Sequence, residues 1–250
     1  MSRIDLFKQH LDEKRAVKII AGIDNFDIDN IRKVVASAQS SGASAIDICA
    51  KEEIITEVCN MTDLPVFVSS IIPEELAKAV ELGADAIELG NFDALYKKGL
   101  LLCAEDVLEL AEKTVELAGR NVFFCVTIPG EIPVNEQIQL ARQLEEIGVD
   151  LIQTEGHFGS EQSDGVKGLM ERAQLTISNT IELCANIETP VMSATGINAV
   201  TAPFAFTAGA SAVGVGSCVN KLESEISMMA AIRNIVDIAS KNIQKNIQLV

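Results

Sequence analysis

Residues 83–89 read Gly83-Ala-Asp-Ala-Ile-Glu-Leu89, and three further stretches of the chain repeat this pattern. They are Gly42-Ala-Ser-Ala-Ile-Asp-Ile48, Gly148-Val-Asp-Leu-Ile-Gln-Thr154 and Gly209-Ala-Ser-Ala-Val-Gly-Val215. In each, a glycine that suits the end of a helix precedes a short apolar run typical of a buried strand. The four stretches fall on every second predicted strand. A closed eight-stranded barrel explains this, because side chains of alternate strands share its interior layers.

Short strand patterns alternate with amphipathic helical patterns from one end of the chain to the other. The eight predicted strands are Val17–Ile23, Ala45–Cys49, Val66–Ile71, Ala86–Leu89, Val122–Ile128, Leu151–Thr154, Val191–Thr195 and Ala212–Val215. Helix signals separate them, with Asp27 as an N-cap, Pro73 in a first helical turn and glycines at helix ends. This order predicts an α/β fold, a single (β/α)₈ TIM barrel of the phosphate-binding type, with one domain over residues 1–250.

The composition narrows the classes of function. Of the 250 residues, 48% are hydrophobic, and 20 Lys and Arg against 36 Asp and Glu give a net charge of −16. Such a surface repels phosphate backbones and anionic lipid at long range, so no nucleic-acid or membrane partner is expected. No apolar stretch approaches the ~20 residues of a membrane span. The first residues do not resemble a targeting peptide, and six scattered cysteines indicate a reducing compartment.

The repeats also predict which side chains point into the barrel. If the aliphatic residues of each repeat face the helices, alternation turns Asp47 and Glu88 inward, together with Gln153 and Gly214. Lys18 on the first strand is expected among them, because two buried carboxylates need a counter-charge. One interpretation is a catalytic set for proton transfer or carbonyl chemistry. The other is a structural ion cluster low in the barrel, with Lys18 reaching toward the bottom.

Small residues follow the last two strands. Thr195, Gly196 and Ile197 come after the seventh strand, and Gly216 and Ser217 after the eighth. Loops of this kind let backbone N–H groups approach a ligand closely, and a helix that starts just behind adds a partial positive charge. TIM barrels often hold a phosphate between these two loops. The sequence therefore predicts an anion site here, and the alternative is that the glycines only permit tight turns.

Glu155 and His157, after the sixth strand, form a candidate acid–base pair, although a loop histidine beside a glutamate is more often a surface pair. Asp47, Glu88 and Glu155 are oxygen ligands of the kind that Mg²⁺ takes, but they do not converge on one element, so no metal site is predicted. Three hydroxyl residues at strand ends are expected to reach the mouth as donors: Ser69, Ser70 and Thr127.

Four motifs together resemble one family. They are Gly22-Ile-Asp-Asn-Phe26, Gly83-Ala-Asp-Ala-Ile-Glu-Leu-Gly-Asn-Phe-Asp93, Ile152-Gln-Thr-Glu-Gly156 and Gly209-Ala-Ser-Ala-Val-Gly-Val-Gly-Ser-Cys-Val-Asn-Lys221. Over nearly its whole length the chain is similar to the hypothetical chloroplast reading frame family of algal plastids and cyanobacteria. The resemblance implies a phosphate-binding barrel in the plastid stroma or the cyanobacterial cytoplasm, and brings no assigned reaction. The segment from His157 diverges from the family pattern, which weakens a catalytic role for this histidine.

Three functions fit these observations. The first is a metabolic enzyme of lyase, isomerase or synthase type that acts on a phosphorylated small molecule, with Glu88 or Glu155 moving protons. The second keeps the phosphate site but fills it with FMN, as in a flavoprotein. The third is a non-catalytic binding or regulatory protein. The apolar residues of the last helix, over 226–247, weakly suggest a homo-oligomer.

Overall fold

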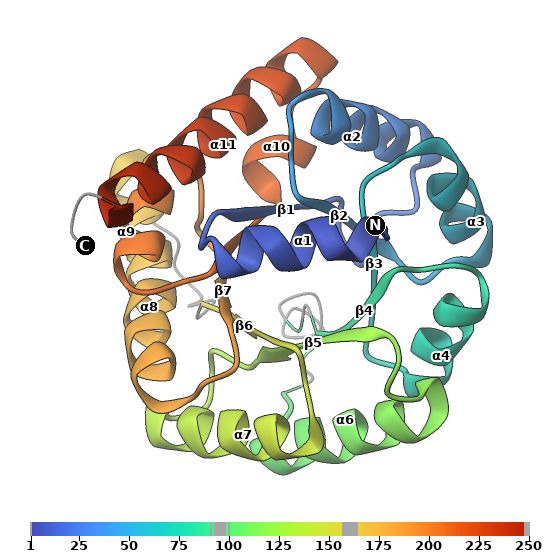
Figure 1. Cartoon of the computed structure of the whole chain (residues 1–250), viewed down its shortest axis with the longest axis vertical. Helices are drawn as coiled ribbons and strands as arrows, with labels where there is room; N and C mark the ends of the chain where they lie inside the picture. The colour runs from blue at the N-terminus through green and yellow to red at the C-terminus, as the bar shows by residue number, and fades with distance from the viewer. Residues whose placement is uncertain (1, 91, 93–98, 100, 157–164, 248–250) are drawn as a thin grey trace.

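The computed structural model describes residues 2–90, 92, 99, 101–156 and 165–247. Eight parallel strands pair in sequence order, and the last pairs with the first, so the sheet closes into a barrel. Figure 1 looks along the barrel and shows the helices as an outer ring around the strands. The predicted (β/α)₈ TIM barrel is therefore confirmed.

The strands lie where the sequence pattern predicts them. Their bounds are β1 Ala16–Ile20, β2 Ala45–Cys49, β3 Val66–Ser70, β4 Ala86–Leu89, β5 Phe123–Ile128, β6 Leu151–Thr154, β7 Val191–Ser193 and β8 Ala212–Val215. The even-numbered strands, which carry the repeat, have the predicted bounds. The odd-numbered strands differ from prediction by a few residues at their ends, because no repeat marks where they stop.

Helices connect the strands and begin and end at the expected signals. The described helices are α1 Arg3–Asp12, α2 Ile28–Ser40, α3 Glu52–Met61, α4 Pro73–Glu81, α6 Ala104–Ala118, α7 Val134–Ile147, α8 Gly165–Asn186, α9 Ala202–Thr207, α10 Ser217–Asn220 and α11 Glu225–Ile247. The Asp27 carboxylate caps α2 by accepting bonds from the backbone N–H groups of Asp29 and Asn30. Gly148 ends α7 with a φ of 88°, a left-handed conformation that glycine adopts without strain.

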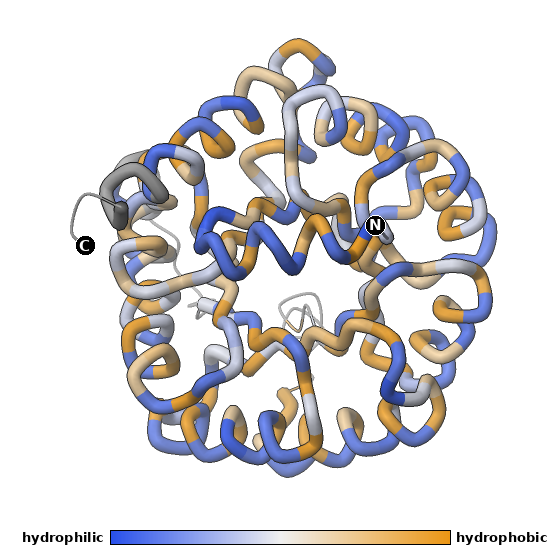
Figure 2. Tube along the Cα trace, in the orientation of Figure 1, coloured by the Kyte–Doolittle hydropathy of each residue, from blue (hydrophilic) through white to orange (hydrophobic). Residues whose placement is uncertain are grey.

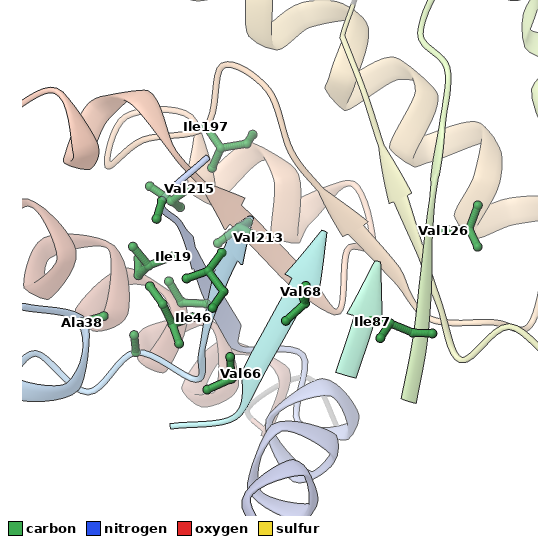
Figure 3. Packing of buried hydrophobic residues seen from close by; sticks show 14 of the residues in the cluster. Ile19, Ala38, Ile46, Val66, Val68, Ile87, Val126, Ile197, Val213 and Val215 are labelled. Carbon is green, nitrogen blue, oxygen red and sulfur yellow. The ribbon is translucent and has the colours of Figure 1, made fainter. Parts of the chain in front are cut away.

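The main hydrophobic core lies between the barrel and its helices. The repeat residues Ile46, Ile87 and Val213 are buried in it, as are Ile19 of β1 and Ala38 of α2. Figure 3 shows Ile19, Ile46 and Ala38 packed together at this layer. Because successive side chains of a strand point to opposite faces, the residues between these aliphatics point into the barrel. The predicted direction of the strand side chains is confirmed.

Helix α1 closes the N-terminal end of the barrel. It lies across the strand ring on the near side in Figure 1. Its Phe7 meets Phe67 of β3 and Phe123 of β5 edge-on, with ring centroids 4.9 and 5.7 Å away. Arg3 anchors the start of the helix by donating to the Asp85 carboxylate at 3.2 Å. With this end filled by aromatic rings, a ligand can approach the interior only from the C-terminal end.

The final helix covers the barrel in its described part. Met228, Ile232, Ile235 and Ala239 of α11 are buried in the main core, so these apolar residues are not exposed as an oligomer surface would require. Ile226, at 80% exposure, is the exception among its large hydrophobic residues of described burial. No described helix of the chain combines the length and the apolar character needed to cross a membrane.

Replacing Phe7 with Ala should destabilise the protein by about 3–5 kcal/mol, because it opens a cavity among three packed rings. Chemical denaturation followed by circular dichroism measures the loss. Leu6→Ala is the matched control, since Leu6 lies beside Phe7 on α1 but is 38% exposed, and should cost less than about 1 kcal/mol. Equal losses for the two variants would contradict the closing role of Phe7.

Candidate functional site

Three charged side chains meet in the middle of the barrel. Lys18 lies on β1, Asp47 on β2 and Glu88 on β4, and the alternation of each strand turns all three inward. The Lys18 ammonium is in direct contact with the Glu88 carboxylate and lies 3.7 Å from Asp47 Oδ2. Each side chain is at most 1% exposed. The structure thus brings together three of the four carboxylate and lysine candidates predicted from sequence.

Neutral side chains extend this ion cluster into one hydrogen-bonded layer. The Ser69 hydroxyl donates to Asp47 Oδ1 at 2.6 Å. The Gln153 amide donates to Glu88 Oε1 at 2.8 Å and to the Thr127 hydroxyl at 2.9 Å. Thr127 in turn donates to Glu88 Oε1 at 3.3 Å. Both carboxylates therefore accept hydrogen bonds from neutral donors, as buried charges require, and the bond from Gln153 to Thr127 joins two of these donors.

The hydroxyl prediction was wrong in its detail. Ser69 and Thr127 do not serve the mouth as donors but bind the two carboxylates inside the barrel. Ser70 donates to the Glu75 carboxylate of α4 at 2.5 Å, because its position on β3 turns it toward the helices. A glycine makes room for one of these contacts, since a Cβ added to Gly90 would lie 2.1 Å from Thr127 Oγ1.

The Lys18 ammonium does not reach solvent at the bottom of the barrel, which corrects one detail of the structural interpretation and leaves open the choice between a structural and a catalytic cluster. The ring of Phe67 lies beside its ammonium, with the centroid 5.1 Å away, and the lysine is fully buried. Burial by itself lowers the pKa of Lys18, but the charges of Glu88 and Asp47 outweigh it and raise the pKa. Lys18 is therefore a protonated ammonium at neutral pH. Burial raises the pKa of the neighbouring Cys125 thiol, which keeps it neutral.

The loop after β7 has an unusual backbone. Thr195 and Gly196 have φ values of 74° and 73°, and a β-branched residue rarely adopts this left-handed conformation. Two threonines hold the loop: Thr176 of α8 donates to the Thr195 carbonyl at 3.0 Å, and Thr201 donates to the Gly196 carbonyl at 2.8 Å. In a trans peptide the N–H points opposite to the C=O. The amides of Gly196 and Ile197 therefore point away from these two threonines.

The loop after β8 lies beside this one. Gly216 precedes the short helix α10, whose first residue is Ser217. The Cys218 thiol donates to the Ile197 carbonyl at 3.6 Å, which links the two loops directly. Asn220 at the end of α10 donates to the Ile20 carbonyl at 3.1 Å and so fixes the helix on β1. The amides of Val219 and Asn220 donate to the Gly216 carbonyl at 2.9 and 3.1 Å, whereas those of Ser217 and Cys218 come too early in α10 to have an acceptor within it.

Glu155 is the first residue after β6, two residues beyond Gln153, and the alternation of the strand, if continued, would place it on the same side. Glu155 is 3% exposed. Its backbone passes close to Gly130, since a Cβ added to this glycine would lie only 2.6 Å from the Glu155 carbonyl oxygen. His157, the other half of the predicted acid–base pair, lies outside the described residues. Among the residues that are described, no three His, Cys, Asp or Glu side chains gather as a metal site requires.

Sequence reasoning missed the contribution of α8. Thr176 holds the Thr195 carbonyl, and the Thr180 hydroxyl bonds to the Ser193 hydroxyl of β7 at 2.6 Å. The two threonines are four residues apart and both are buried, so they share the inner face of the helix. The only sequence signal was a pair of hydroxyl residues at helical spacing. Such residues usually bond to their own helix, as Thr180 also does with the Thr176 carbonyl at 2.8 Å.

Replacing Lys18 with Met should cost about 3–5 kcal/mol at neutral pH, because two carboxylates stay buried without their cation. In the wild type the raised pKa of Lys18 keeps its contribution constant below the ordinary lysine pKa of about 10.4. Urea unfolding from pH 4.5 to 8 measures the loss.

Lys78→Met is the control, because Lys78 pairs with Glu81 at 3.0 Å on the exposed surface of α4. We expect a loss below about 1 kcal/mol there, with little change across the same pH range. If Lys18→Met were as mild as the control, the buried ion cluster would not have the energetics described.

Solved structures with this fold include enzymes of phosphorylated compounds. The 3-hexulose-6-phosphate synthase from Salmonella typhimurium has a TM-score of 0.67, with 13% identity over 91% of this chain and 99% of that one. The (S)-3-O-geranylgeranylglyceryl phosphate synthase from Thermoplasma acidophilum, in complex with its substrate sn-glycerol-1-phosphate, has a TM-score of 0.63. It is 16% identical and covers 96% of this chain and 99% of that one. At these identities the similarity shows the fold alone.

Proteins related to this chain by sequence are much more similar to it than these solved structures are. The uncharacterized protein ycf23 of Cyanophora paradoxa is 36% identical over 235 residues, which cover 94% of this chain and 95% of that protein. The family model described as Protein of unknown function (DUF561) matches residues 2–245. The chain therefore belongs to the DUF561 family, as a relative of the ycf23 proteins, and the resemblance inferred from its motifs is confirmed.

Proposed function

We propose that this chain binds a phosphorylated small molecule at the C-terminal end of its barrel and acts on it as a lyase, isomerase or synthase. The phosphate would lie between the loops after β7 and β8, and the reacting part of the molecule would face the barrel interior. Barrels of this type often bind phosphate between these loops and the N-terminus of a short extra helix, the position that α10 occupies here. The two phosphate-compound synthases with the same fold add support.

The observation that carries the proposal is the backbone at Thr195 and Gly196. Left-handed geometry at Thr195 costs about 1–2 kcal/mol. A glycine there would make a tight turn without this cost, so turn formation alone does not account for the strain. Hydrogen bonds from Thr176 and Thr201 to the two carbonyls turn the amides of Gly196 and Ile197 the other way. Convergent backbone amides are suited to an anion, even in a protein of net charge −16.

Glu155 is the residue that we assign to proton transfer. It continues the inward side of β6 past Gln153 and stands at the level of the mouth, where reacting groups of TIM barrels gather. Glu88 is less suited to touch substrate, because Lys18, Thr127 and Gln153 already occupy its oxygens. Since the Lys18 ammonium is protonated, it lacks the lone pair that attack on a carbonyl needs. We assign Lys18, Asp47 and Glu88 the role of a fixed electrostatic layer beneath the substrate.

We further propose that the protein works in the plastid stroma or the cyanobacterial cytoplasm. The family relationship supports this, because the relatives include the ycf23 protein of the alga Cyanophora paradoxa. The free thiols agree with a reducing compartment of this kind, since every cysteine of the chain is unpaired.

Gly216→Asp tests the anion site. The backbone at Gly216 has a φ of −114°, and an added Cβ would meet its nearest atom at 3.7 Å, so the variant should fold. Its carboxylate would occupy the anion position and repel phosphate. We expect affinity for inorganic phosphate and glycerol phosphate to fall at least about tenfold, because adjacent like charges cost several kcal/mol. Isothermal titration calorimetry measures the change.

Ser40→Asp adds the same charge at the C-terminal end of α2, near the opposite end of the barrel, and serves as the control. It should bind phosphate as the wild type does. Equal affinity in all three proteins, or no phosphate binding by the wild type at millimolar concentration, would overturn the anion site.

Glu155→Gln tests the chemical role. Native mass spectrometry of the protein from its natural source first identifies the molecule that copurifies, and turnover of that molecule is then followed. Because the amide cannot carry the proton, kcat should fall by about 10²–10⁴ while phosphate affinity stays unchanged. Glu146→Gln, on the exposed side of α7, should keep full activity.

Two outcomes would redirect the assignment. If Glu155→Gln and Glu88→Gln alter stability but leave turnover intact, these carboxylates do not move protons. If the copurifying molecule is FMN, visible as flavin absorbance, the site serves a flavoprotein.

A further inference from the structure

The side chain of Gln153 carries a buried oxygen atom inside the barrel. Figure 2 shows hydrophilic residues mainly along the outer side of the helix ring, with hydrophobic ones toward the barrel. Gln153 on β6 departs from this pattern, because it points inward and is only 2% exposed. Among the residues that the structure describes, none donates a hydrogen bond to its Oε1 atom. Buried polar atoms without a partner are rare in native proteins, so this oxygen needs an explanation.

The groups around Gln153 fix the direction of this oxygen. The amide nitrogen donates to Glu88 Oε1 at 2.8 Å and to the Thr127 hydroxyl at 2.9 Å. Turning the amide over would place its oxygen against the Glu88 carboxylate, where two acceptors repel each other. Oε1 therefore points away from Glu88 and toward Gly214 of β8, where an added Cβ would lie 3.3 Å from it.

The barrel wall that Oε1 faces is made of small and aliphatic residues. Gly214 lies on β8 and Ala194 directly follows β7, so both lie below the loops to which we assign the phosphate. Ile20 of β1 lies nearer the mouth, two residues beyond Lys18, which pairs with Gly214. A Cβ added to Gly214 would meet Ile20 Cδ1 at 3.2 Å. This methyl group is the end of a rotatable side chain, so a ligand atom that enters from the mouth can displace it.

We propose that Gln153 Oε1 accepts a hydrogen bond from a hydroxyl group of the phosphorylated substrate. This inference rests on the proposed function and narrows its substrate to a phosphate ester of a polyol. Gly214 precedes Gly216 by two residues, which corresponds to about 7 Å along a strand. At about 1.5 Å per bond, a hydroxyl on the second or third carbon from a phosphate bound beside Gly216 reaches the level of Gly214.

A bound water molecule is the alternative donor to this oxygen. Water would satisfy Oε1 without any contribution from the substrate. The surroundings favour a ligand group, because a buried water usually makes about three hydrogen bonds. Beside Oε1, the nearest atoms at this point are the carbons Ala194 Cβ and Ile20 Cδ1. Such carbons pack well against the carbon chain that carries a ligand hydroxyl.

Two phosphate esters with the same three-carbon skeleton test the proposal. Glycerol phosphate has hydroxyl groups on the carbons beyond its ester carbon, and propyl phosphate has none. The wild type should bind glycerol phosphate at least about tenfold more tightly, because only this ester supplies the missing donor. Isothermal titration calorimetry with both esters and with inorganic phosphate measures this preference.

Two variants locate the preference at Oε1. Gln153→Leu removes the oxygen, whereas Gly214→Ala keeps the amide and places a methyl group 3.3 Å from Oε1. Both should bind the two esters equally and keep the wild-type affinity for inorganic phosphate. Gln137→Leu is the matched control, because Gln137 on α7 is also buried but donates to the Ile132 carbonyl at 2.9 Å. It should keep the preference, and thermal unfolding checks that each variant folds.

Three results would overturn the proposal. Equal affinity of the wild type for both esters, with phosphate binding intact, would contradict the hydrogen bond and leave the anion site standing. A preference that persists in Gln153→Leu or in Gly214→Ala, whichever of them folds, would assign the hydroxyl to another partner. A wild type that does not bind inorganic phosphate would remove the anion site and this inference with it.

Discussion

The contact of Lys18 with Asp47 and Glu88 is the constraint on which the rest of the barrel depends. Removing each of these ions from water costs several kcal/mol, and their mutual pairing, together with hydrogen bonds from neighbouring side chains, offsets this cost. A shift of one residue in β2 or β4 would turn a carboxylate outward among aliphatic side chains and an isoleucine inward. The ion cluster and the outer core therefore select the same register. The packing of the helices on the outside and the polar layer on the inside therefore both follow from the alternation of side chains along each strand.

The side-chain alternation and the closed N-terminal end of the barrel together determine where a ligand could meet the polar residues of the interior. Below the ion cluster, Phe7 and Phe67 fill the space and exclude water. Above it come Glu155, the first residue after β6, and the loops that follow β7 and β8. The polarity of the interior thus increases from the N-terminal to the C-terminal end. A substrate bound at the mouth would meet the charged layer from above, with the apolar rings lowering the local dielectric beneath it.

The strand bounds and side-chain directions that follow from the repeat could be predicted from the sequence. Contacts between residues on different elements could not. The even strands had the predicted bounds, and Asp47, Glu88 and Gln153 had the predicted direction, because period-two alternation is local. Ser69 and Thr127 were misplaced because their partners lie on other strands. The role of Thr176 depends on α8 packing beside the loop after β7. The closure by Phe7 depends on where a whole helix lies, which no periodic pattern specifies.

An ion cluster of this kind calls for an explanation beyond stability. Well-packed hydrophobic residues of similar volume often stabilise a protein as well as a buried ion pair does, or better. The middle layer of this barrel nevertheless contains a lysine and two carboxylates. Three neutral residues, Ser69, Thr127 and Gln153, donate hydrogen bonds to these carboxylates. The pairing and these hydrogen bonds fix the positions of the charged groups before any ligand binds. Fixed charges of this kind stabilise a molecule whose charge changes during a reaction without having to reorganise, which agrees with the proposed role of the layer beneath a substrate.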